Sequence, residues 1–323
     1  MKKWIATLAA ASALLPLGAQ AAYPEHALTW IVPFSAGGPT DSMARNIANR
    51  LSQEIGQSIV VENAPGAGGT IGSTKAARAK ADGYTFLVGH IGYMAAAPSL
   101  YSNLRYDPVK DFDAVFRFPD TPLVLLAGGQ SSFKTTDDLI KFAKANPGKL
   151  NFSNAGVGST SHLVAAMFAA RAGIEIQSVA YKGAGPALND LMGGQVDAMF
   201  DQTNTALPQT RGNKVKALGL TSAQRMPQFP DVTTMAESAI PGFQVSTWYG
   251  LYAPKGTPKD VIDTLFAAYQ RVMQDKKFTG TMESQGILLL SDTAYSPTAF
   301  QKHTSDEIEN WKKVIQQAGI QLN

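Results

Sequence analysis

The sequence predicts an α/β fold made of two domains with mainly parallel sheets. A short β-rich run, a turn rich in Gly, Ser or Asn, and a helix with periodic apolar residues recur in that order, which is typical of βαβ units. The 323 residues, of which 45% are apolar, can build more than one hydrophobic core. A Gly-rich strand–turn–helix segment occurs near residue 35 and again near residue 155, as expected if each domain contributes one to a shared cleft.

The candidate strands are mostly short, continuous apolar runs, as buried parallel strands should be. Three helices have recognisable starts. Thr135 is followed three residues later by Asp138, and Thr257 and Ser296 each precede a proline at the first helical position. The last helix places apolar residues on one face, which we expect in the core: Phe300, Ile308, Trp311 and Ile315. The candidate strands are 29–32, 59–62, 85–89, 123–126, 150–153, 176–180, 198–201, 215–221 and 245–252.

The first 21 residues have the three parts of a secretory signal peptide. Lys2 and Lys3 precede an apolar run that stops at Pro16, and a small-residue site ends at Ala21. The apolar run is too short to span a bilayer. Because the chain has no cysteine, an N-terminal lipid-modified cysteine is excluded. We therefore expect a soluble protein that is exported to the periplasm and is not a lipoprotein.

Composition excludes several classes of function. Removing residues 1–21 leaves 302 residues and lowers the formal net charge from +3 to +1. A nearly neutral protein without runs of like charge is a poor partner for nucleic acid or anionic membranes. Without cysteine there is no disulfide framework and no thiolate metal site. The four histidines are far apart in the sequence, so a metal site is not expected.

The first Gly-rich turn predicts an anion site. A strand ends, small residues allow close backbone approach, and Pro39 opens a helix. Free N–H groups and the helix dipole would then face a crevice. Asp41 follows in the first helical turn, where we favour a carboxylate that accepts bonds from backbone donors; facing the cleft, it would order water or receive a ligand ammonium. The candidate ligand-binding residues of this turn are Phe34, Ser35, Ala36, Gly37, Gly38 and Asp41.

The second turn adds hydroxyl groups before its helix, and hydroxyls with backbone amides suit a carboxylate. It lacks the third glycine of a dinucleotide loop and the Lys of a P-loop, so nucleotide binding is discounted. Ser161 and His162 are adjacent and diverge on a helix, so they do not form a catalytic pair, and we expect His162 to cap or pack. The candidate ligand-binding residues of this turn are Ser153, Asn154, Ala155, Gly158, Ser159 and Thr160.

Two further residues end predicted strands. His90 stands between Gly89 and Gly92, and Asp201 precedes a polar run. In open α/β sheets ligands bind at the carboxyl ends of strands. A buried structural role for His90 and a helix-capping role for Asp201 remain open alternatives to ligand contact.

Pro and Gly interrupt the pattern near 118–122 and 239–243, and we expect the connections between domains there. The chain would then run from one domain into the other and back. The expected division is a signal peptide at 1–21, a discontinuous first lobe of 22–120 with 243–323, and a second lobe of 121–242.

A set of short segments occurs in order over essentially the whole mature chain. The segments are Ala27-Leu28-Thr29-Trp30-Ile31-Val32-Pro33-Phe34-Ser35-Ala36-Gly37-Gly38-Pro39-Thr40-Asp41, Val61-Glu62-Asn63-Ala64-Pro65-Gly66-Ala67-Gly68-Gly69-Thr70-Ile71-Gly72, Asp82-Gly83-Tyr84-Thr85, Tyr106-Asp107-Pro108-Val109-Lys110-Asp111-Phe112, Ser159-Thr160-Ser161-His162-Leu163, Tyr181-Lys182-Gly183, Trp248-Tyr249-Gly250 and Ala253-Pro254-Lys255-Gly256-Thr257-Pro258. In these segments the chain resembles the Bug family, the solute receptors of tripartite tricarboxylate transporters.

The resemblance implies a periplasmic-binding-protein type II fold, in which two α/β lobes joined by two crossovers close on an organic anion. It implies a carboxylate held by the two Gly-rich turns, with Asp201 at the cleft. Tyr93 and the alanines after it depart from the small polar residues and Asn of many relatives. An aromatic or less polar carboxylate is therefore among the expected ligands.

These observations together predict a non-catalytic, monomeric receptor without a cofactor. It would capture a small mono- or dicarboxylate and deliver it to the membrane subunits of a tripartite tricarboxylate transporter. A sensory protein that reports the bound acid to a membrane signalling partner would have the same fold and site, so that alternative stays open. An exported hydrolase that uses Ser159 or Ser161 is a third hypothesis.

Overall fold

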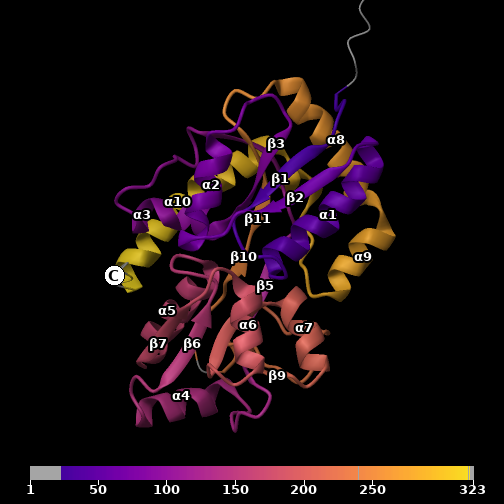
Figure 1. The fold of residues 1–323 in the computed structure, drawn as a ribbon. Coiled ribbons are helices and arrows are strands. Elements are labelled where there is room, and N and C mark those ends of the chain that lie inside the picture. The colour runs from indigo at the N-terminus through magenta and orange to yellow at the C-terminus, as the bar shows by residue number, and fades with distance from the viewer. Residues whose placement is uncertain (1–22, 239, 319, 321–323) are drawn as a thin grey trace, which may run out of the picture.

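The protein consists of two lobes, each a sheet covered by helices (Figure 1). A computed structural model describes residues 23–238, 240–318 and 320, so the predicted signal peptide at 1–21 lies outside the described residues. Within those residues, no helix combines the length and the hydropathy of a membrane span.

The first lobe has a five-stranded sheet in the order β2-β1-β3-β11-β4. Its first three strands run parallel, and β11 is antiparallel to both of its neighbours. The elements of this lobe are β1 (Leu28–Val32), α1 (Pro39–Ile55), β2 (Ile59–Asn63), η1 (Ala67–Gly69), α2 (Thr70–Ala77), β3 (Thr85–His90), η2 (Gly92–Ala96), α3 (Ala97–Leu100), β4 (Phe112–Arg117), β11 (Tyr249–Pro254), α8 (Lys259–Gln274), α9 (Lys276–Ser284), η3 (Asp292–Tyr295) and α10 (Pro297–Ala318).

The second lobe has a six-stranded sheet in the order β10-β5-β8-β6-β7, with β9 also paired to β5. Strand β6 is parallel to β7 and β8, whereas β5 is antiparallel to β8, β9 and β10. The elements of this lobe are β5 (Thr121–Gly128), α4 (Thr136–Ala145), β6 (Leu150–Asn154), α5 (Thr160–Ala172), β7 (Ile176–Ala180), α6 (Ala184–Met192), β8 (Ala198–Gln202), α7 (Thr203–Arg211), β9 (Val215–Leu220) and β10 (Ser246–Thr247).

The expectation of mainly parallel sheets is confirmed, with one reversed strand in each sheet among the described residues: β11 in the first lobe and β5 in the second, the strands that follow the passage of the chain from one lobe to the other. Strands β1, β3, β6 and β8 end at the cleft. Strands β5 and β11 begin beside it, and Tyr249 at the start of β11 faces His90 at the end of β3. A chain that enters a lobe from the cleft must therefore run antiparallel to the strands that finish there.

Two short segments connect the lobes. The first lies between β4 and β5, and the second is Trp248, which separates β10 in the second sheet from β11 in the first. Phe243 and Val245 also pack in the core of the second lobe. We therefore propose that the second lobe extends to Thr247, beyond the expected boundary at 242/243, and that the first crossing is near 118–120 as expected.

Local sequence signals account for most elements. The predicted capping box is confirmed: the Thr135 hydroxyl accepts from the N–H of Asp138, whose carboxylate accepts from Thr135 in return. Ser296 accepts from the N–H of Ala299. The expected Thr257 cap is wrong, since α8 begins at Lys259 and the Thr257 hydroxyl donates to the carbonyl of Pro254.

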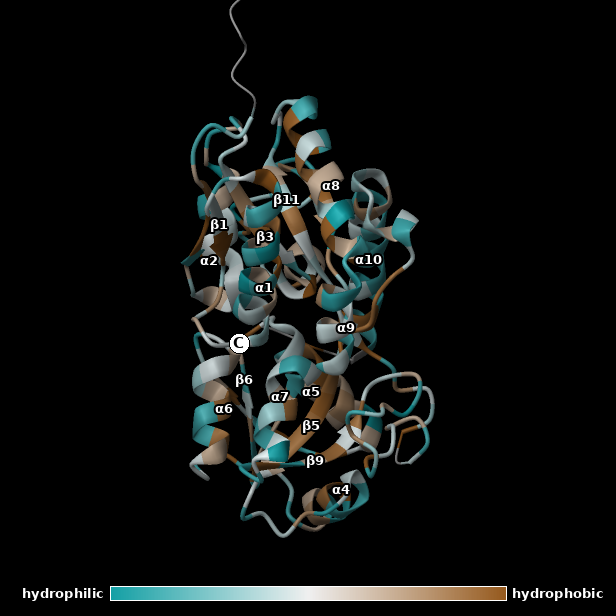
Figure 2. Ribbon diagram, turned by 90° about the vertical axis from the view of Figure 1, so that its right-hand side faces the viewer, coloured by the Kyte–Doolittle hydropathy of each residue, from teal (hydrophilic) through white to brown (hydrophobic). Residues whose placement is uncertain are grey.

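The strand prediction failed at two places. Strand β4 was missed because Asp113 and Arg117 interrupt its apolar run. The single strand expected at 245–252 is divided at Trp248 between the two sheets. Apolar residues fill β5 in the second lobe (Figure 2). The large aromatic core of the first lobe contains Phe300, Trp311 and Ile315 of α10, as predicted, and Ile308 packs against it.

Candidate functional site

A small cavity lies between the two lobes. Its volume is about 10 Å³, which is room for roughly one water molecule. The lobes contact each other beside it, Ser35 with Lys182 and His90 with Thr160, so they must move apart before this cavity can admit an organic acid. The first lobe contributes Phe34, Gly38, Pro39, Thr40 and His90 to its lining, and the second contributes Ala155, Ser159, Thr160, Ser161, Ala184 and Gln202.

Four helices begin at this cavity. Helices α1, α6 and α7 have Gly38, Gly183 and Gln202 as their N-terminal caps, and none of these caps makes a side-chain hydrogen bond to its helix. At α5 the Ser159 hydroxyl accepts from the N–H of His162. The first backbone N–H groups of a helix have no partner inside it. Their convergence makes the cavity a site of positive potential without a cationic side chain.

Glycine allows the starts of α1 and α6 to meet across the cleft. A Cβ at Gly38 would lie 3.5 Å from the backbone N of Gly185, and a Cβ at Gly183 would lie 2.9 Å from the backbone N of Ser35. The backbone N and the hydroxyl of Ser35 both donate to the carbonyl of Lys182, at 3.1 and 3.0 Å. The two lobes are thus joined by backbone contact beside the cavity.

The second Gly-rich turn is braced by its own polar groups. The N–H of Ala155 donates to the Ser161 hydroxyl and that of Gly156 to the Asn154 side chain, both at 2.9 Å. The hydroxyls of Ser159 and Ser161 are 3.1 Å apart. Nδ1 of His162 accepts from the N–H of Gly158, so His162 packs within the turn. Hydroxyls therefore hold the shape of this turn as well as lining the cavity.

His90 connects the lobes at the base of the cavity. It is 2% exposed, and its Nε2 lies 3.0 Å from the Thr160 hydroxyl of the opposite lobe. Its Nδ1 accepts from the N–H of Gly92 at 3.0 Å. Burial lowers the pKa of His90 to about 3, so the ring is neutral at physiological pH.

Asp41 lies behind the first turn and does not line the cavity. Its carboxylate accepts from the N–H of Gly37 at 3.0 Å, from Asn63 Nδ2 at 2.9 Å and from Arg45 Nε at 3.0 Å. Burial opposes ionisation, but the bonds from Arg45, Gly37 and Asn63 prevail and lower the pKa of Asp41. Asp41 is therefore an ionised brace of the turn.

Asp201 also lies outside the cavity lining, beside Gln202. Its side chain is fully buried. One carboxylate oxygen accepts from the Thr205 hydroxyl at 2.7 Å, and the other has no partner among the described residues. Burial raises the pKa of Asp201 to about 7. Burial raises the pKa of Tyr249, and the negative charge of ionised Asp201 adds to that rise.

The structure brings together part of the predicted site. The predicted residues that line the cavity are Phe34, Gly38, His90, Ala155, Ser159 and Thr160. Those that lie beside or behind it are Ser35, Ala36, Gly37, Asp41, Ser153, Asn154, Gly158 and Asp201. Sequence reasoning missed five lining residues, which are Pro39, Thr40, Ser161, Ala184 and Gln202. Gly183, which opens α6, was the available signal for Ala184.

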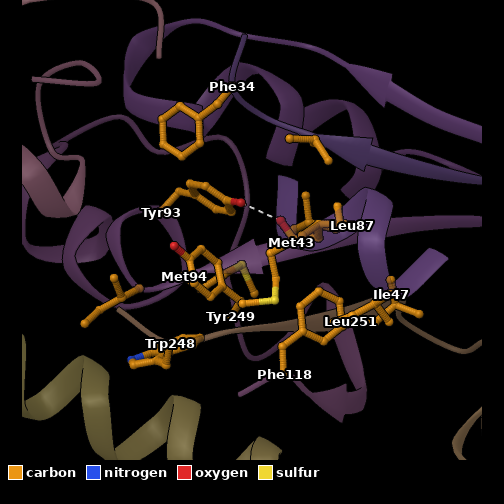
Figure 3. Packing of buried hydrophobic residues seen from close by; sticks show 14 of the residues in the cluster. Phe34, Met43, Ile47, Leu87, Tyr93, Met94, Phe118, Trp248, Tyr249 and Leu251 are labelled. Carbon is orange, nitrogen blue, oxygen red and sulfur yellow. Dashed lines mark hydrogen bonds between the residues drawn. The ribbon is translucent and has the colours of Figure 1, made fainter. Parts of the chain in front are cut away.

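Tyr93 does not shape the cavity. Its ring is fully buried and packs beside Phe34, 5.7 Å between ring centroids (Figure 3). Its hydroxyl donates to the carbonyl of Val88. The residue that suggested an aromatic ligand therefore belongs to the wall behind the cavity. In the described part of the chain, no group of three or more His, Cys, Asp or Glu side chains could hold a metal ion.

Comparison with known proteins places the chain in a family. Residues 43–320 match the family described as the tripartite tricarboxylate transporter family receptor. The structure of the periplasmic binding protein BugD is similar at 41% identity and a TM-score of 0.89, covering 93% of this chain and 99% of that one.

Two ligand-bound structures from Rhodopseudomonas palustris are also similar. MatC with bound malate is 37% identical, with a TM-score of 0.87 and coverage of 91% of this chain and 100% of its own. Rpa4515 with adipate is 33% identical, with a TM-score of 0.88 and coverage of 93% and 99%. The chain has the two-lobed fold of these periplasmic binding proteins, and it belongs to the Bug family of tripartite tricarboxylate transporter receptors.

Proposed function

We propose that this protein is a periplasmic, non-catalytic receptor for a small organic carboxylate. It captures a mono- or dicarboxylate between its lobes and delivers it, as a monomer without a cofactor, to the membrane subunits of a tripartite tricarboxylate transporter. The observation that carries the proposal is the convergence of the α1, α5, α6 and α7 N-termini on one cavity that no Lys or Arg lines.

The energies are sufficient for useful affinity. A micromolar dissociation constant corresponds to about −8 kcal/mol. Each helix terminus contributes up to about 2 kcal/mol to an anion in a partly buried site. Charge-assisted hydrogen bonds add about 1.5–3 kcal/mol each before the entropy cost of association. Neutral donors can therefore hold a carboxylate here without an ion pair.

The two ligand-bound relatives support a dicarboxylate as the first candidate. Malate and adipate differ in chain length and in a hydroxyl group, and they share two carboxylates. The first carboxylate would occupy the converging helix starts. Opening of the lobes would provide the volume that the rest of the ligand needs.

The hydrolase hypothesis has little support from the geometry. Ser159 and Ser161 contact each other and backbone N–H groups, and neither is bonded to a histidine side chain. His90 does contact Thr160, but its Nδ1 already accepts a hydrogen bond. In a neutral ring the proton is then on Nε2, which cannot act as a base toward the Thr160 hydroxyl.

A calorimetric screen tests the proposed ligand class. Protein unfolded in denaturant and refolded, to remove any bound acid, is titrated with malate, adipate, succinate, acetate and benzoate, and with glucose and putrescine as controls that have no carboxylate. We expect at least one carboxylate to bind with micromolar or tighter affinity. Failure of every carboxylate, with tight binding of glucose or putrescine, would overturn the proposal.

A matched pair of variants tests the location of the site. Gly38→Val would force a branched side chain against the start of α6, whereas the single Cβ of Gly38→Ala meets its neighbours at ordinary contact distances of 3.5–3.6 Å. We expect Gly38→Val to weaken binding at least 100-fold and Gly38→Ala less than tenfold, with both proteins folded by circular dichroism. Equal affinities for the two variants would place the ligand elsewhere.

A further inference from the structure

Among the described residues, His90 is the one titratable side chain that lines the cavity. Its hydrogen bonds determine its tautomer as well as its position. It ends β3 in the first lobe, and Thr160 begins α5 in the second lobe. Their contact at 3.0 Å therefore exists only when the lobes are closed. Both residues are buried, with exposures of 2% and 1%.

The tautomer of His90 follows from its second contact. A backbone N–H can only donate, so the bond from Gly92 requires Nδ1 to be an acceptor without a hydrogen. The proton of the neutral ring is then on Nε2, and Nε2 must donate to the Thr160 hydroxyl. Phe34, Tyr93 and Tyr249 surround the ring with centroids 5.3–5.5 Å away. These aromatic neighbours bury the imidazole, and burial disfavours its protonation.

The Thr160 hydroxyl oxygen thereby accepts from His90 Nε2 through one of its two lone pairs. The contact with His90 is the one hydrogen bond of the Thr160 side chain to the described residues. Its own hydrogen is therefore available to the cavity that Thr160 lines. A hydroxyl whose hydrogen is free to turn into the cavity suits a ligand acceptor such as a carboxylate.

We infer that His90 is a positioning residue, which fixes the Thr160 hydroxyl as a donor to the ligand carboxylate and makes that donor available only in the closed lobes. The inference rests on the proposed function and assigns a specific role within it. Selectivity for anions then comes partly from a neutral histidine that does not touch the ligand charge directly. The Gly92 N–H, the His90 ring and the Thr160 hydroxyl form a relay of donors across the cleft.

Two substitutions at position 90 separate positioning from packing. In His90→Gln the side-chain amide N can take the place of Nε2 and donate to Thr160. In His90→Asn the shorter side chain can accept from Gly92 but does not reach Thr160. With malate and adipate as probes, we expect His90→Gln to stay within about threefold of the wild type and His90→Asn to lose about 10- to 30-fold. Equal losses in both variants would overturn the inference.

Substitutions at Thr160 supply a test that does not depend on how the His90 variants fold. Thr160→Ser keeps the hydroxyl and should retain affinity within about threefold. Thr160→Val removes it with little change in shape and should lose as much as His90→Asn. The double variant of His90→Asn and Thr160→Val should lose no more ligand affinity than either of these single variants, because both substitutions break the same relay. Additive losses would show that the two residues act separately.

The tautomer is measured directly by nitrogen-15 NMR of histidine-labelled protein. We expect the His90 signals of a neutral ring protonated at Nε2, unchanged from pH 8 to pH 5. Protonation at Nδ1, or a cationic ring in this range, would contradict the inference. This spectrum requires no ligand. If the wild type binds no carboxylate the proposed function fails, whereas binding that is indifferent to His90 and Thr160 rejects only the relay.

Discussion

The two lobes each place one buried aspartate behind a helix start at the cavity, and the two carboxylates differ in nearly every respect. Asp41 receives hydrogen bonds from a backbone N–H, an amide and a guanidinium. Asp201 receives one bond from a threonine and leaves one oxygen without a partner among the described residues. The pKa of Asp41 is lowered, and that of Asp201 is raised to about 7.

The difference shows that low exposure alone does not determine whether a carboxylate is charged. Both side chains are nearly inaccessible, at 4% and 0% exposure. Asp41 lies less deep in the protein and receives more hydrogen bonds, and each bond to the ionised form offsets part of the desolvation cost. The first lobe therefore contains a fixed negative charge that holds its turn. The second lobe contains a group that is neutral below about pH 7 and becomes charged above it.

The largest expected effect is on the pH dependence of stability. The unfolded chain releases the Asp201 proton near pH 3.8, and the folded protein holds it to about pH 7. The free energy of unfolding therefore falls as pH rises through this window, by on the order of 4 kcal/mol in total. In Asp201→Asn this loss should vanish. Urea denaturation of both proteins at pH 5, 6, 7 and 8 measures it.

The difference between variant and wild type is the informative quantity. Buried His90, His162 and His303 have lowered pKa values. They act in the opposite sense, because their stabilising contribution is lost as pH falls below about 6.5. They are common to both proteins and cancel. If Asp201→Asn gains no stability relative to the wild type between pH 5 and pH 8, Asp201 is ionised in the folded protein at pH 5.

The matching change in the first lobe should act in the opposite direction. Asp41→Asn removes an ionised acceptor from three donors, and we expect a loss of about 2–3 kcal/mol of unfolding free energy at pH 7. Because the folded pKa of Asp41 is lowered, its contribution is present above pH 3.8 and is lost only in stronger acid. Denaturation at pH 7 and pH 5 should therefore give the same loss. A loss below 0.5 kcal/mol would contradict the role of Asp41 as a brace.

The residues around these two aspartates show which parts of the site could be predicted from the sequence. Gly37 and Gly38 after an apolar run predicted the first turn correctly, because local chemistry specifies such a turn. Ala184 and Gln202 were missed as lining residues because α6 and α7 meet the cavity only through tertiary packing. Strand β4 was missed because its polar residues are matched by partners that the sequence does not reveal, such as Asp120 for Arg117. The protonation of Asp201 depends on the absence of such partners nearby.

The difference between the two aspartates also predicts a smaller effect, on the pH dependence of ligand affinity. Asp201 adjoins Gln202, which lines the cavity, so its ionisation places a negative charge near a site built for an anion. We expect the dissociation constant for malate or adipate to rise roughly 3- to 10-fold from pH 6 to pH 8. Asp201→Asn should bind with nearly constant affinity over this range, and Asp41→Asn should retain the wild-type slope. Calorimetry at constant ionic strength distinguishes these outcomes.

The smallest effect is expected from Arg45, although it forms an ion pair with Asp41 at 2.9 Å. The Arg45 side chain is 49% exposed, and exposed ion pairs contribute about 0–1 kcal/mol. Asn63 instead donates both to Asp41 and to the carbonyl of Phe34, at 2.9 and 3.0 Å, so it ties two strand ends to the turn. Urea denaturation at pH 7 should therefore rank the losses as Arg45→Ala below Asn63→Ala below Asp41→Asn. If Arg45→Ala loses as much unfolding free energy as Asp41→Asn, the guanidinium and not the neutral donors keeps Asp41 ionised. The presence of one cation would then account for the difference between Asp41 and Asp201.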